Sequence, residues 1–307
     1  MKYCTLGEMN ASRIVMGCMR IAGQPLRDIE KVIIEAQKAG VNMFDHADIY
    51  GGGNCERVFG VAMKDLGIAR KDYLVQTKCG IRRFEGGGAW FDFSAEHIIE
   101  SAENSLKRLN MEYIDVYLLH RPDTLIQPEE VAEAFEKLRQ DGKVRAFGVS
   151  NSSAGQMELM RKFGVNIVAN QMQFSLMHTP MIDAGFNVNM YQDASISRAG
   201  DALEYCRLHD IALQAWSPMQ YGFFDGVFVG NEKFPEVNKA LETLAEKYNC
   251  TPATMAMAWI LRHPAFKQIV TGTTSPEHMR EMCQAVDINL TREEWYSLYL
   301  SPNRKLP

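Results

Sequence analysis

The segment Tyr113–His120 has the sequence YIDVYLLH, and its centre, Val116-Tyr117-Leu118-Leu119, is a continuous apolar run. Such runs are typical of strands that are buried on both faces, as in a parallel sheet. Further short runs, rich in β-branched and aromatic residues, recur along the chain at intervals of roughly 25–35 residues. The eight predicted strands are Ile14–Cys18, Val41–Asp45, Tyr73–Lys78, Tyr113–His120, Ala146–Ser150, Ile167–Gln171, Ile211–Trp216 and Gln268–Thr271.

Amphipathic helical patterns lie between these strands. Ser94 is a good N-cap for one of them, which has acidic residues in its first turn and basic residues in its last. Another begins with Pro128 in its first turn and stops at Gly142. The predicted helices are Ile29–Ala39, Ala95–Leu109, Pro128–Gln140, Ser152–Phe163, Ala199–His209 and Pro252–His263, with additional helices over Leu241–Tyr248, Ser275–Ala285 and Arg292–Leu300.

The repeated alternation of strand and helix predicts an α/β protein of the (β/α)8 TIM-barrel class. No linker-like tract divides the chain, so we expect residues 1–307 to form one domain, with extra C-terminal helices and long loops at the barrel mouth. The least regular stretch, residues 179–198, follows the sixth strand and is expected to overhang that mouth. A doubly wound sheet is the alternative. Its dinucleotide fingerprint is missing, because Gly51-Gly52-Gly53 is not G-x-G-x-x-G and Gly86-Gly87-Gly88 has no strand immediately before it.

The composition is that of a globular protein. The 307 residues are 46% hydrophobic and 23% charged, and the net charge is -5. This balance argues against a broad surface for nucleic acid or anionic membrane, and no apolar run is long enough to span a bilayer. The seven cysteines are odd in number and contain no C-x-x-C pair, which argues against a disulfide framework. Because the N-terminus also lacks the apolar stretch of a signal peptide, we expect a cytoplasmic protein.

Polar side chains follow several of the predicted strands. In a (β/α)8 barrel the chemistry lies at the C-terminal ends of the strands. Asp45 ends the second predicted strand, Lys78 the third and His120 the fourth, and Tyr50 lies five residues beyond Asp45. Each residue alone has a structural alternative: a solvated strand end, a satisfied histidine or a core aromatic. Their matching positions nevertheless predict that all four converge at one mouth.

These four residue types suit acid catalysis. A buried lysine beside a tyrosine favours the phenolate, so we expect Lys78 to lower the pKa of Tyr50, while Asp45 keeps Lys78 charged. Tyr50 would then serve as a proton donor near neutral pH. His120 is predicted to form a hydrogen bond with the substrate oxygen.

The run Asp45-His46-Ala47-Asp48-Ile49-Tyr50-Gly51, with Glu56 following, resembles the aldo-keto reductase signature D-x-A-x-x-Y-G-x-x-x-x-E. The Asp-His-Ala-Asp-Ile-Tyr form is similar to a bacterial subgroup of that family. The resemblance covers nearly the whole chain, in order and in spacing. It extends to Lys78, Leu118–Asp123, Gly142–Asn151, Asn170-Gln171, Trp216-Ser217-Pro218 and Gly272–Ser275.

The resemblance implies a barrel that binds NADP(H) in an extended form and reduces aldehydes or ketones to alcohols. It implies that Asp45, Tyr50, Lys78 and His120 form a catalytic tetrad, with Tyr50 as the general acid. It also implies that Ser150, Asn151 and Gln171 bind the carboxamide and that Trp216 stacks on the nicotinamide. The full set of predicted cofactor contacts is Gly17, Met19, Asp45, Ser150, Asn151, Gln171, Trp216, Ser217, Met219, Gly272, Thr273, Thr274, His278 and Arg280.

The sequence departs from the family pattern in two places. Met219-Gln220-Tyr221-Gly222-Phe223-Phe224 stands where a Leu-Gly-x-Gly loop usually covers the pyrophosphate. Gly272-Thr273-Thr274 lacks the lysine that often follows this glycine, and the usual arginine aligns near His278, with Arg280 close by. A 2′-phosphate prefers a permanent cation. NAD(H) is therefore an alternative to NADP(H).

The predicted substrate contacts are Trp90, Tyr50 and His120. Trp90 belongs to a long loop with three phenylalanines, which either wall a pocket for an apolar carbonyl compound or pack the loop onto the barrel. The leading functional hypothesis is a carbonyl reductase acting on a small molecule, with no nucleic-acid or membrane partner. One alternative is a regulatory subunit of the same fold that binds cofactor with little turnover. A metal-dependent hydrolase is disfavoured, because neither H-x-H nor H-E-x-x-H is present, and no metal site is predicted.

Overall fold

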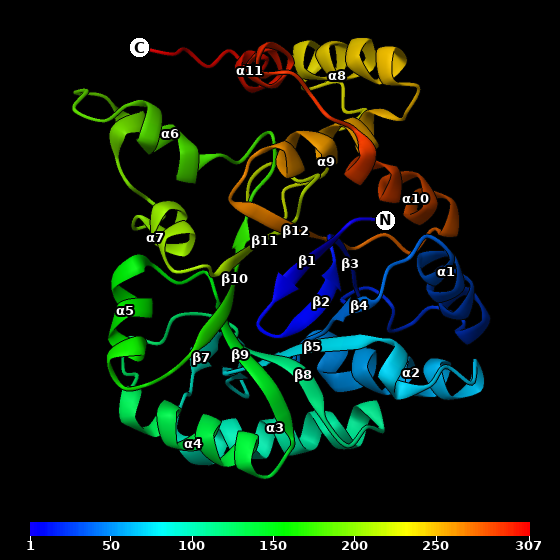
Figure 1. The fold of residues 1–307 in the computed structure, drawn as a ribbon, viewed down its shortest axis with the longest axis vertical. Coiled ribbons are helices and arrows are strands. Elements are labelled where there is room, and N and C mark those ends of the chain that lie inside the picture. The colour runs from blue at the N-terminus through cyan, green and yellow to red at the C-terminus, as the bar shows by residue number, and fades with distance from the viewer.

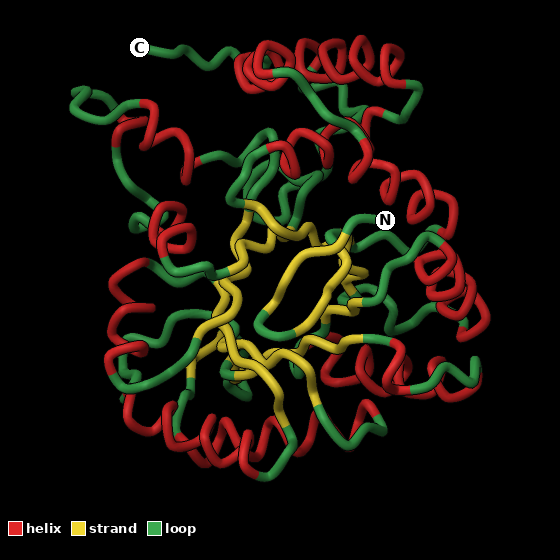
Figure 2. The backbone as a smooth tube through the Cα atoms, viewed as in Figure 1, coloured by secondary structure: helices red, strands yellow, loops and turns green.

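Eight parallel strands close into a barrel in the computed structural model, which describes residues 1–307 (Figures 1 and 2). Around the barrel the order is β10, β11, β12, β3, β4, β5, β8, β9. Each predicted strand overlaps one of them, so the predicted (β/α)8 barrel is confirmed. Their bounds are β3 Ile14–Gly17, β4 Met43–Asp45, β5 Leu74–Cys79, β8 Ile114–Leu119, β9 Val144–Ser150, β10 Ile167–Gln173, β11 Ala212–Trp216 and β12 Phe266–Thr271.

Eleven helices cover the outside of the barrel (Figure 1). They are α1 Leu26–Lys38, α2 Asn54–Asp65, α3 Ala95–Leu109, α4 Pro128–Gln140, α5 Ala154–Lys162, α6 Pro180–Phe186, α7 Ala202–Leu208, α8 Pro235–Tyr248, α9 Pro252–Arg262, α10 Pro276–Met282 and α11 Arg292–Leu300. The predicted extra helices are present. The sequence prediction missed α2, placed α6 in an irregular stretch and began α8 at Leu241 instead of Pro235. The buried residues of α2, including Cys55, Phe59, Ala62 and Met63, have the helical spacing that would have revealed it.

An N-terminal hairpin that the sequence did not predict fills one end of the barrel. Its strands, β1 Tyr3–Leu6 and β2 Met9–Ser12, lie inside the ring of barrel strands in Figure 2. Leu6 and Ala11 pack in one buried cluster with residues from the starts of barrel strands, among them Met43, Val168 and Ala212. This apolar layer closes the N-terminal end, so the opposite end is the open mouth.

A second hairpin stands over the end of β5. Its strands are β6 Ile81–Arg83 and β7 Ala89–Phe91, so the expectation of no strand before Gly86-Gly87-Gly88 is wrong. Gly80 joins β5 to the hairpin with φ of +105°, and a Cβ there would lie 1.9 Å from the ring of buried Phe93. Only glycine fits this backbone and this contact. The hairpin is thereby held against the barrel edge.

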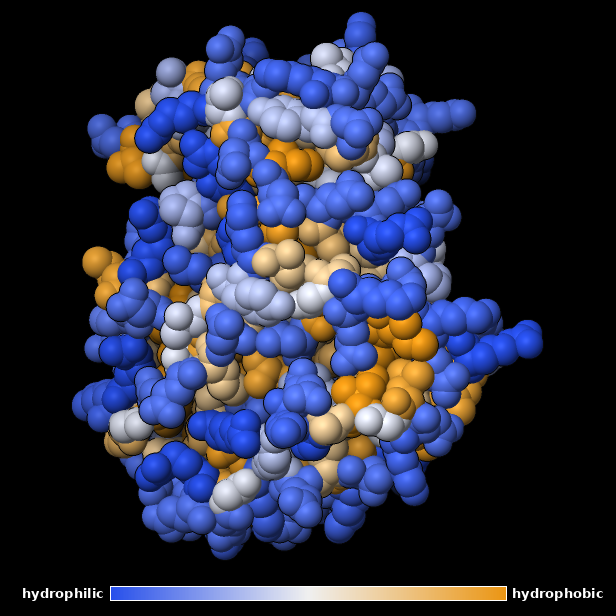
Figure 3. Space-filling model, turned by 45° about the vertical axis from the view of Figure 1, so that its right-hand side comes forward, coloured by the Kyte–Doolittle hydropathy of each residue, from blue (hydrophilic) through white to orange (hydrophobic).

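The surface is predominantly hydrophilic on the face drawn in Figure 3, with apolar residues scattered among the polar ones. None of the helices combines the length and apolar character needed to cross a bilayer. All seven cysteines are free thiols, and five of them are buried.

Candidate active site

The strand ends bring Asp45, Tyr50, Lys78 and His120 together at the open mouth. Asp45 is the last residue of β4, Lys78 is the next-to-last residue of β5, and His120 directly follows β8. The Lys78 Nζ donates to Asp45 Oδ2 at 2.7 Å and to the Tyr50 hydroxyl at 3.2 Å. The rings of Tyr50 and His120 meet edge to face, with centroids 5.7 Å apart. The four side chains therefore form one connected group.

Lys78 is fully buried, with 0% of its side chain exposed. Its third acceptor is the backbone oxygen of His46, also at 2.7 Å. An ammonium has three protons, so all of them are used. Burial alone would lower the pKa of Lys78, but Asp45 and Tyr50 outweigh that effect and raise it. Lys78 is therefore a fixed positive charge beneath the Tyr50 hydroxyl.

A layer of glutamines inside the barrel holds Asp45. Gln76 and Gln171 each donate an amide proton to Asp45 Oδ1, at 2.6 and 2.9 Å. Gln214 joins these two and exchanges hydrogen bonds with Gln76 at 2.9 and 3.0 Å. Gln268 accepts from Gln214 at 2.8 Å. Both Asp45 oxygens are therefore partnered, which offsets the cost of burying a carboxylate.

The structure contradicts the expectation that Tyr50 has a lowered pKa. Burial raises the pKa of Tyr50, and this outweighs the lowering effect of Lys78. Sequence spacing indicated the neighbouring lysine but not the depth at which the hydroxyl would lie. Tyr50 consequently keeps its proton over the neutral range, and Lys78 is placed to stabilise the phenolate once that proton leaves.

Three consecutive glycines set the position of Tyr50. Gly51, Gly52 and Gly53 have φ of +57°, +63° and +86°, a left-handed run that L side chains rarely adopt. A Cβ on Gly53 would also lie 2.8 Å from the Arg108 side chain. The run turns the chain sharply between Tyr50 and the start of α2 at Asn54. Gly51-Gly52-Gly53 does not match the dinucleotide-binding fingerprint. It instead forms the turn that positions Tyr50 at the mouth.

His120 is neutral, and it has a free nitrogen. Burial, together with the charges of Lys78 and Arg121, lowers the pKa of His120 well below its usual value. Its Nδ1 is buried and has no hydrogen-bond partner. A neutral imidazole can accept at one nitrogen and donate from the other. No hydrogen bond within the chain uses the other ring nitrogen, Nε2, so neutral His120 can offer that nitrogen to an oxygen atom.

A second buried acidic group lies behind the tetrad. Glu56 accepts from Thr77 at 2.6 Å and from the Arg108 guanidinium at 2.6 Å. Asp48 has no such partner, and its Oδ1 is buried without a hydrogen bond. Burial and the charge of Glu56 raise the pKa of Asp48 to about 7. Asp48 and Glu56 both stand in the quoted signature, but their spacing did not show that they would be buried near each other.

The residues predicted to hold the carboxamide and the nicotinamide ring form one network. Ser150 Oγ donates to the Gln171 backbone oxygen at 2.9 Å and accepts from Asn151 Nδ2 at 2.7 Å. Asn151 Oδ1 accepts from the Trp216 indole N–H at 3.1 Å. Trp216 is thus fixed in place at the end of β11 and remains partly exposed. Ser217, next to it, has a left-handed φ of +51°.

The other predicted cofactor residues lie across the mouth, where β3 and β12 pair. Gly17 ends β3, and a Cβ on it would lie 3.0 Å from the Thr271 backbone oxygen. Met19, Gly272 and Thr273 are partly buried, while Thr274, His278 and Arg280 are exposed. Met219 follows Trp216 and is partly buried, and its backbone oxygen accepts from Phe228 at 3.0 Å.

The sequence did not indicate a role for two arginines at the mouth, Arg20 and Arg121. Arg20 NH1 lies 3.4 Å from the Gly272 backbone oxygen, beside the Gly272–Thr274 segment. The Arg121 guanidinium carbon lies 5.4 Å from the Trp216 ring and 5.5 Å from the Phe223 ring. Neither makes an ion pair within the chain. Arg121 stands in the quoted segment after His120, but sequence alone could not show where its long side chain points.

The aromatic residues of the β6–β7 hairpin pack on one another. Trp90 is 37% exposed, lies 6.2 Å from the Phe84 ring, and has the Arg82 guanidinium 4.8 Å from its centroid. Arg82 in turn forms an ion pair with Asp92 at 2.8 Å. Trp90 therefore stays a predicted substrate contact, and its observed contacts are within the hairpin.

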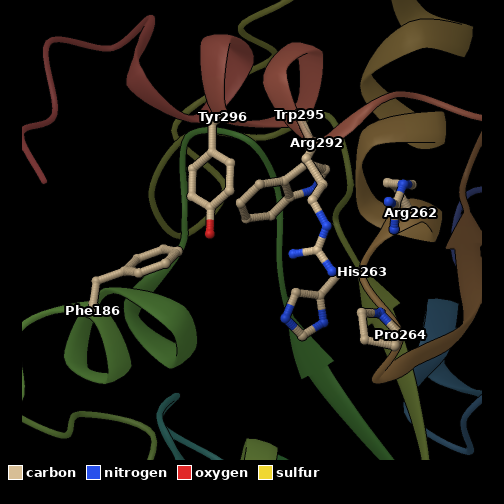
Figure 4. A pocket seen from close by; sticks show the side chains of 7 residues that line it. All are labelled: Phe186, Arg262, His263, Pro264, Arg292, Trp295 and Tyr296. Carbon is tan, nitrogen blue, oxygen red and sulfur yellow. The ribbon is translucent and has the colours of Figure 1, made fainter.

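A pocket of about 270 Å³ lies outside the mouth, between α6, α9 and α11 (Figure 4). The side chains of Arg292 and Tyr296 project into it from α11, facing Phe186 and His263. None of the predicted site residues lines it. Elsewhere, no group of three or more His, Cys, Asp or Glu side chains is arranged to hold a metal ion.

Comparison with known proteins gives several whole-length matches. Oxidoreductase YdhF of Escherichia coli is 33% identical over 94% of this chain and 92% of its own length. An NADH-specific methylglyoxal reductase of the same organism is 30% identical over 95% of each chain. A putative voltage-gated potassium channel subunit beta of Schizosaccharomyces pombe is 29% identical over 86% of this chain and 80% of its own.

A solved structure has the same fold. The crystal structure of the thermostable aldo-keto reductase Tm1743, in complex with the inhibitor epalrestat, superposes with a TM-score of 0.75. It is 27% identical and covers 98% of this chain and 100% of its own. The family model described as "Aldo/keto reductase family" matches residues 13–299. With the barrel and these whole-length relatives, this shows that the chain belongs to the aldo/keto reductase family of oxidoreductases.

Proposed function

We propose that the protein reduces aldehydes or ketones to alcohols with a reduced nicotinamide cofactor, and that Tyr50 donates the proton. One observation carries this proposal. The Tyr50 hydroxyl lies 3.2 Å from a buried ammonium, Lys78, whose charge is in turn fixed by Asp45 at 2.7 Å. Negative charge develops on the carbonyl oxygen as the carbon is reduced, so a proton donor beside a fixed cation matches what the reaction needs.

The bound cofactor would supply a hydride to the carbonyl carbon. Tyr50 would donate its proton to the carbonyl oxygen, and Lys78 would stabilise the resulting phenolate across their hydrogen bond. Neutral His120, with a free ring nitrogen, would orient the same oxygen. In the oxidative direction Tyr50 would accept the alcohol proton.

The mouth fits an anionic dinucleotide. Trp216 offers a partly exposed ring whose orientation is fixed by Asn151. Asn151, which is bonded to Trp216, and its partner Ser150 support the predicted carboxamide site, whereas both amide protons of Gln171 are used by Asp45 and Gln214. Arg20 lies beside the Gly272–Thr274 segment, where it supports a pyrophosphate site. Arg280 is exposed on α10, two residues after His278, the predicted 2′-phosphate position. We propose NADP(H) as the preferred cofactor and NAD(H) as the alternative.

The test is a steady-state assay of cofactor oxidation with a panel of aldehydes and ketones, run with NADPH and with NADH. We expect saturable turnover with at least one aldehyde and loss of that turnover in Tyr50→Phe. Tight NADPH binding without turnover on any carbonyl compound would contradict the reductase assignment.

That outcome would favour a regulatory role. The similarity to a putative potassium channel subunit beta is the observation that keeps this second candidate open. A cofactor-binding subunit can retain the same side chains, so turnover is the measurement that separates the two functions.

A further inference from the structure

Arg121 is a cation held over the mouth by aromatic rings. It follows His120 directly, and its guanidinium carbon lies 5.4 Å from the centroid of Trp216 and 5.5 Å from that of Phe223. Trp216 is anchored to Asn151, and the side chain of Phe223 is 61% exposed at the rim. The rings therefore position the guanidinium next to the tetrad and leave it without an anionic neighbour.

This guanidinium has no polar partner in the chain. Arg121 makes no ion pair and no side-chain hydrogen bond, although it is partly buried. The nearest acidic side chain in sequence, Asp123, instead accepts from the Leu125 backbone at 2.9 Å. Burial lowers the pKa of Arg121, and the neighbouring Tyr50 acts in the opposite direction. A partly desolvated guanidinium with five unused donors is a binding site for an anion.

The charges of the side chains at the mouth also favour an anionic ligand. Asp45 and Lys78 cancel each other in a buried pair at 2.7 Å, and His120 is neutral. Arg121 is therefore an uncompensated positive charge beside the reacting position, in a protein whose net charge is -5. A positively charged mouth on an acidic protein favours negatively charged ligands.

The backbone of Arg121 and the segment proposed for the cofactor phosphates follow opposite strands of the barrel. In the closed order β10, β11, β12, β3, β4, β5, β8, β9, strand β8 lies diametrically opposite β12. Arg121 follows β8, whereas the segment proposed for the phosphates, Gly272–Thr274, follows β12. The Arg121 guanidinium reaches from β8 to Trp216 and Phe223, which follow β11. An NADPH titration therefore separates an anion on the substrate from one on the cofactor.

We propose that Arg121 binds an anionic oxygen group, a carboxylate or a phosphate, on the carbonyl substrate, so that the enzyme prefers anionic carbonyl compounds over neutral ones of the same size. This inference rests on the proposed reductase function. The guanidinium would receive the anion through charge-assisted hydrogen bonds while Tyr50 and His120 hold the carbonyl oxygen. Trp216 and Phe223 would set the distance between the two ends of the substrate.

The test compares kcat/KM for matched pairs: succinic semialdehyde against butanal for a carboxylate, and glyceraldehyde phosphate against glyceraldehyde for a phosphate. We expect the wild type to favour the anionic member of one pair. In Arg121→Gln that preference should fall by roughly 10–100-fold, the range for losing hydrogen bonds to a charged group. Arg121→Lys keeps the positive charge but loses the parallel N–H donors of the guanidinium, so it should retain part of the preference. The pair that responds identifies the group.

Two controls make the result specific. Arg139→Gln removes one exposed positive charge on α4, where Arg139 pairs with Glu136, and should leave the preference unchanged. A fluorescence titration of NADPH should give the same Kd in Arg121→Gln as in wild type, and a large loss there would assign Arg121 to the cofactor instead. Equal preference ratios in wild type and Arg121→Gln, with butanal still reduced, would overturn this proposal but not the reductase function. Absence of turnover on all four compounds and on the wider panel would overturn both.

Discussion

The floor of the mouth, formed by Asp45 and Lys78, differs from its rim in how fully the polar groups are paired. The rim is formed by Arg20, Arg121 and Phe223. On the floor, Lys78 donates to three acceptors, and both Asp45 oxygens are bonded. On the rim, Arg20 and Arg121 have no ion partner, and Phe223 is exposed. Under the proposed function, the catalytic groups are already paired and positioned without a ligand, whereas the proposed ligand-binding groups still have unused donors. Changes to the floor should abolish turnover or destabilise the fold, and changes to the rim should alter preference.

The largest effect is expected for Lys78→Met. Losing the cation leaves Asp45 as an unpaired buried charge, so we expect kcat to fall by roughly 10²–10⁴ and stability by about 3–5 kcal/mol. Kinetics and chemical denaturation measure the two losses. Lys64→Met, at an exposed position on α2, is the matched control.

A double variant separates chemistry from folding in this comparison. Asp45→Asn combined with Lys78→Met removes both charges, so it should recover part of the lost stability while staying inactive. Recovery of turnover together with stability would show that Lys78 acts only through the fold.

Gln214→Leu tests the layer beneath the floor. Gln76 and Gln268 would each lose a donor at 3.0 and 2.8 Å, so we expect a loss of about 2–4 kcal/mol in unfolding free energy. The loss in kcat should be smaller than for Lys78→Met, because Asp45 keeps both of its amide donors. Gln140→Leu changes an exposed position on α4. Comparing the unfolding free energies of the two variants isolates the contribution of the buried glutamine. Equal stability of the two variants would mean that the layer adds nothing to the fold.

Asp48→Asn should change how stability depends on pH. The pKa of Asp48 is raised to about 7 in the folded protein, above its ordinary value, so the stability that this group contributes is present at acid pH and is lost as pH rises to about 7. Asparagine cannot ionise. The variant should gain over wild type between about pH 4 and 7, by on the order of 4 kcal/mol at the plateau. Asp65→Asn, exposed at the end of α2, is the control, and parallel curves for Asp48→Asn and wild type would contradict the account.

The smallest effect is expected at the rim, for Arg280→Ala. It should weaken NADPH by about 3–10-fold and leave NADH nearly unchanged, because only NADPH carries the 2′-phosphate. Arg20→Ala should instead weaken both cofactors alike, since the pyrophosphate is common to them. Titrations of both cofactors decide the matter. Equal losses for both cofactors in Arg280→Ala would remove Arg280 from this role, and tighter NADH binding in wild type would reverse the proposed preference.

The difference between the floor and the rim of the mouth also explains which features the sequence could predict. Buried parallel strands appear as continuous apolar runs, and their C-terminal ends must meet, so Asp45, Lys78 and His120 could be placed together in advance. Gln214 and Gln268 lie inside such runs, where a single sequence does not show which residues face the barrel interior. The pKa of Tyr50 depended on burial depth, which spacing does not give. The direction of the Arg121 side chain depended on Trp216 and Phe223, nearly a hundred residues away in the chain.

The central claim is that the Tyr50 proton completes the reduction. Single-turnover kinetics of Tyr50→Phe with a good aldehyde, together with an NADPH titration, test it most directly, because phenylalanine keeps the ring and removes only the hydroxyl. We expect NADPH affinity close to wild type and a rate lower by roughly 10²–10⁴, the range for losing a general acid. Normal NADPH binding with turnover within a few-fold of wild type would mean that the proton comes from another group and that the Asp45–Lys78–Tyr50 arrangement is not the catalytic centre.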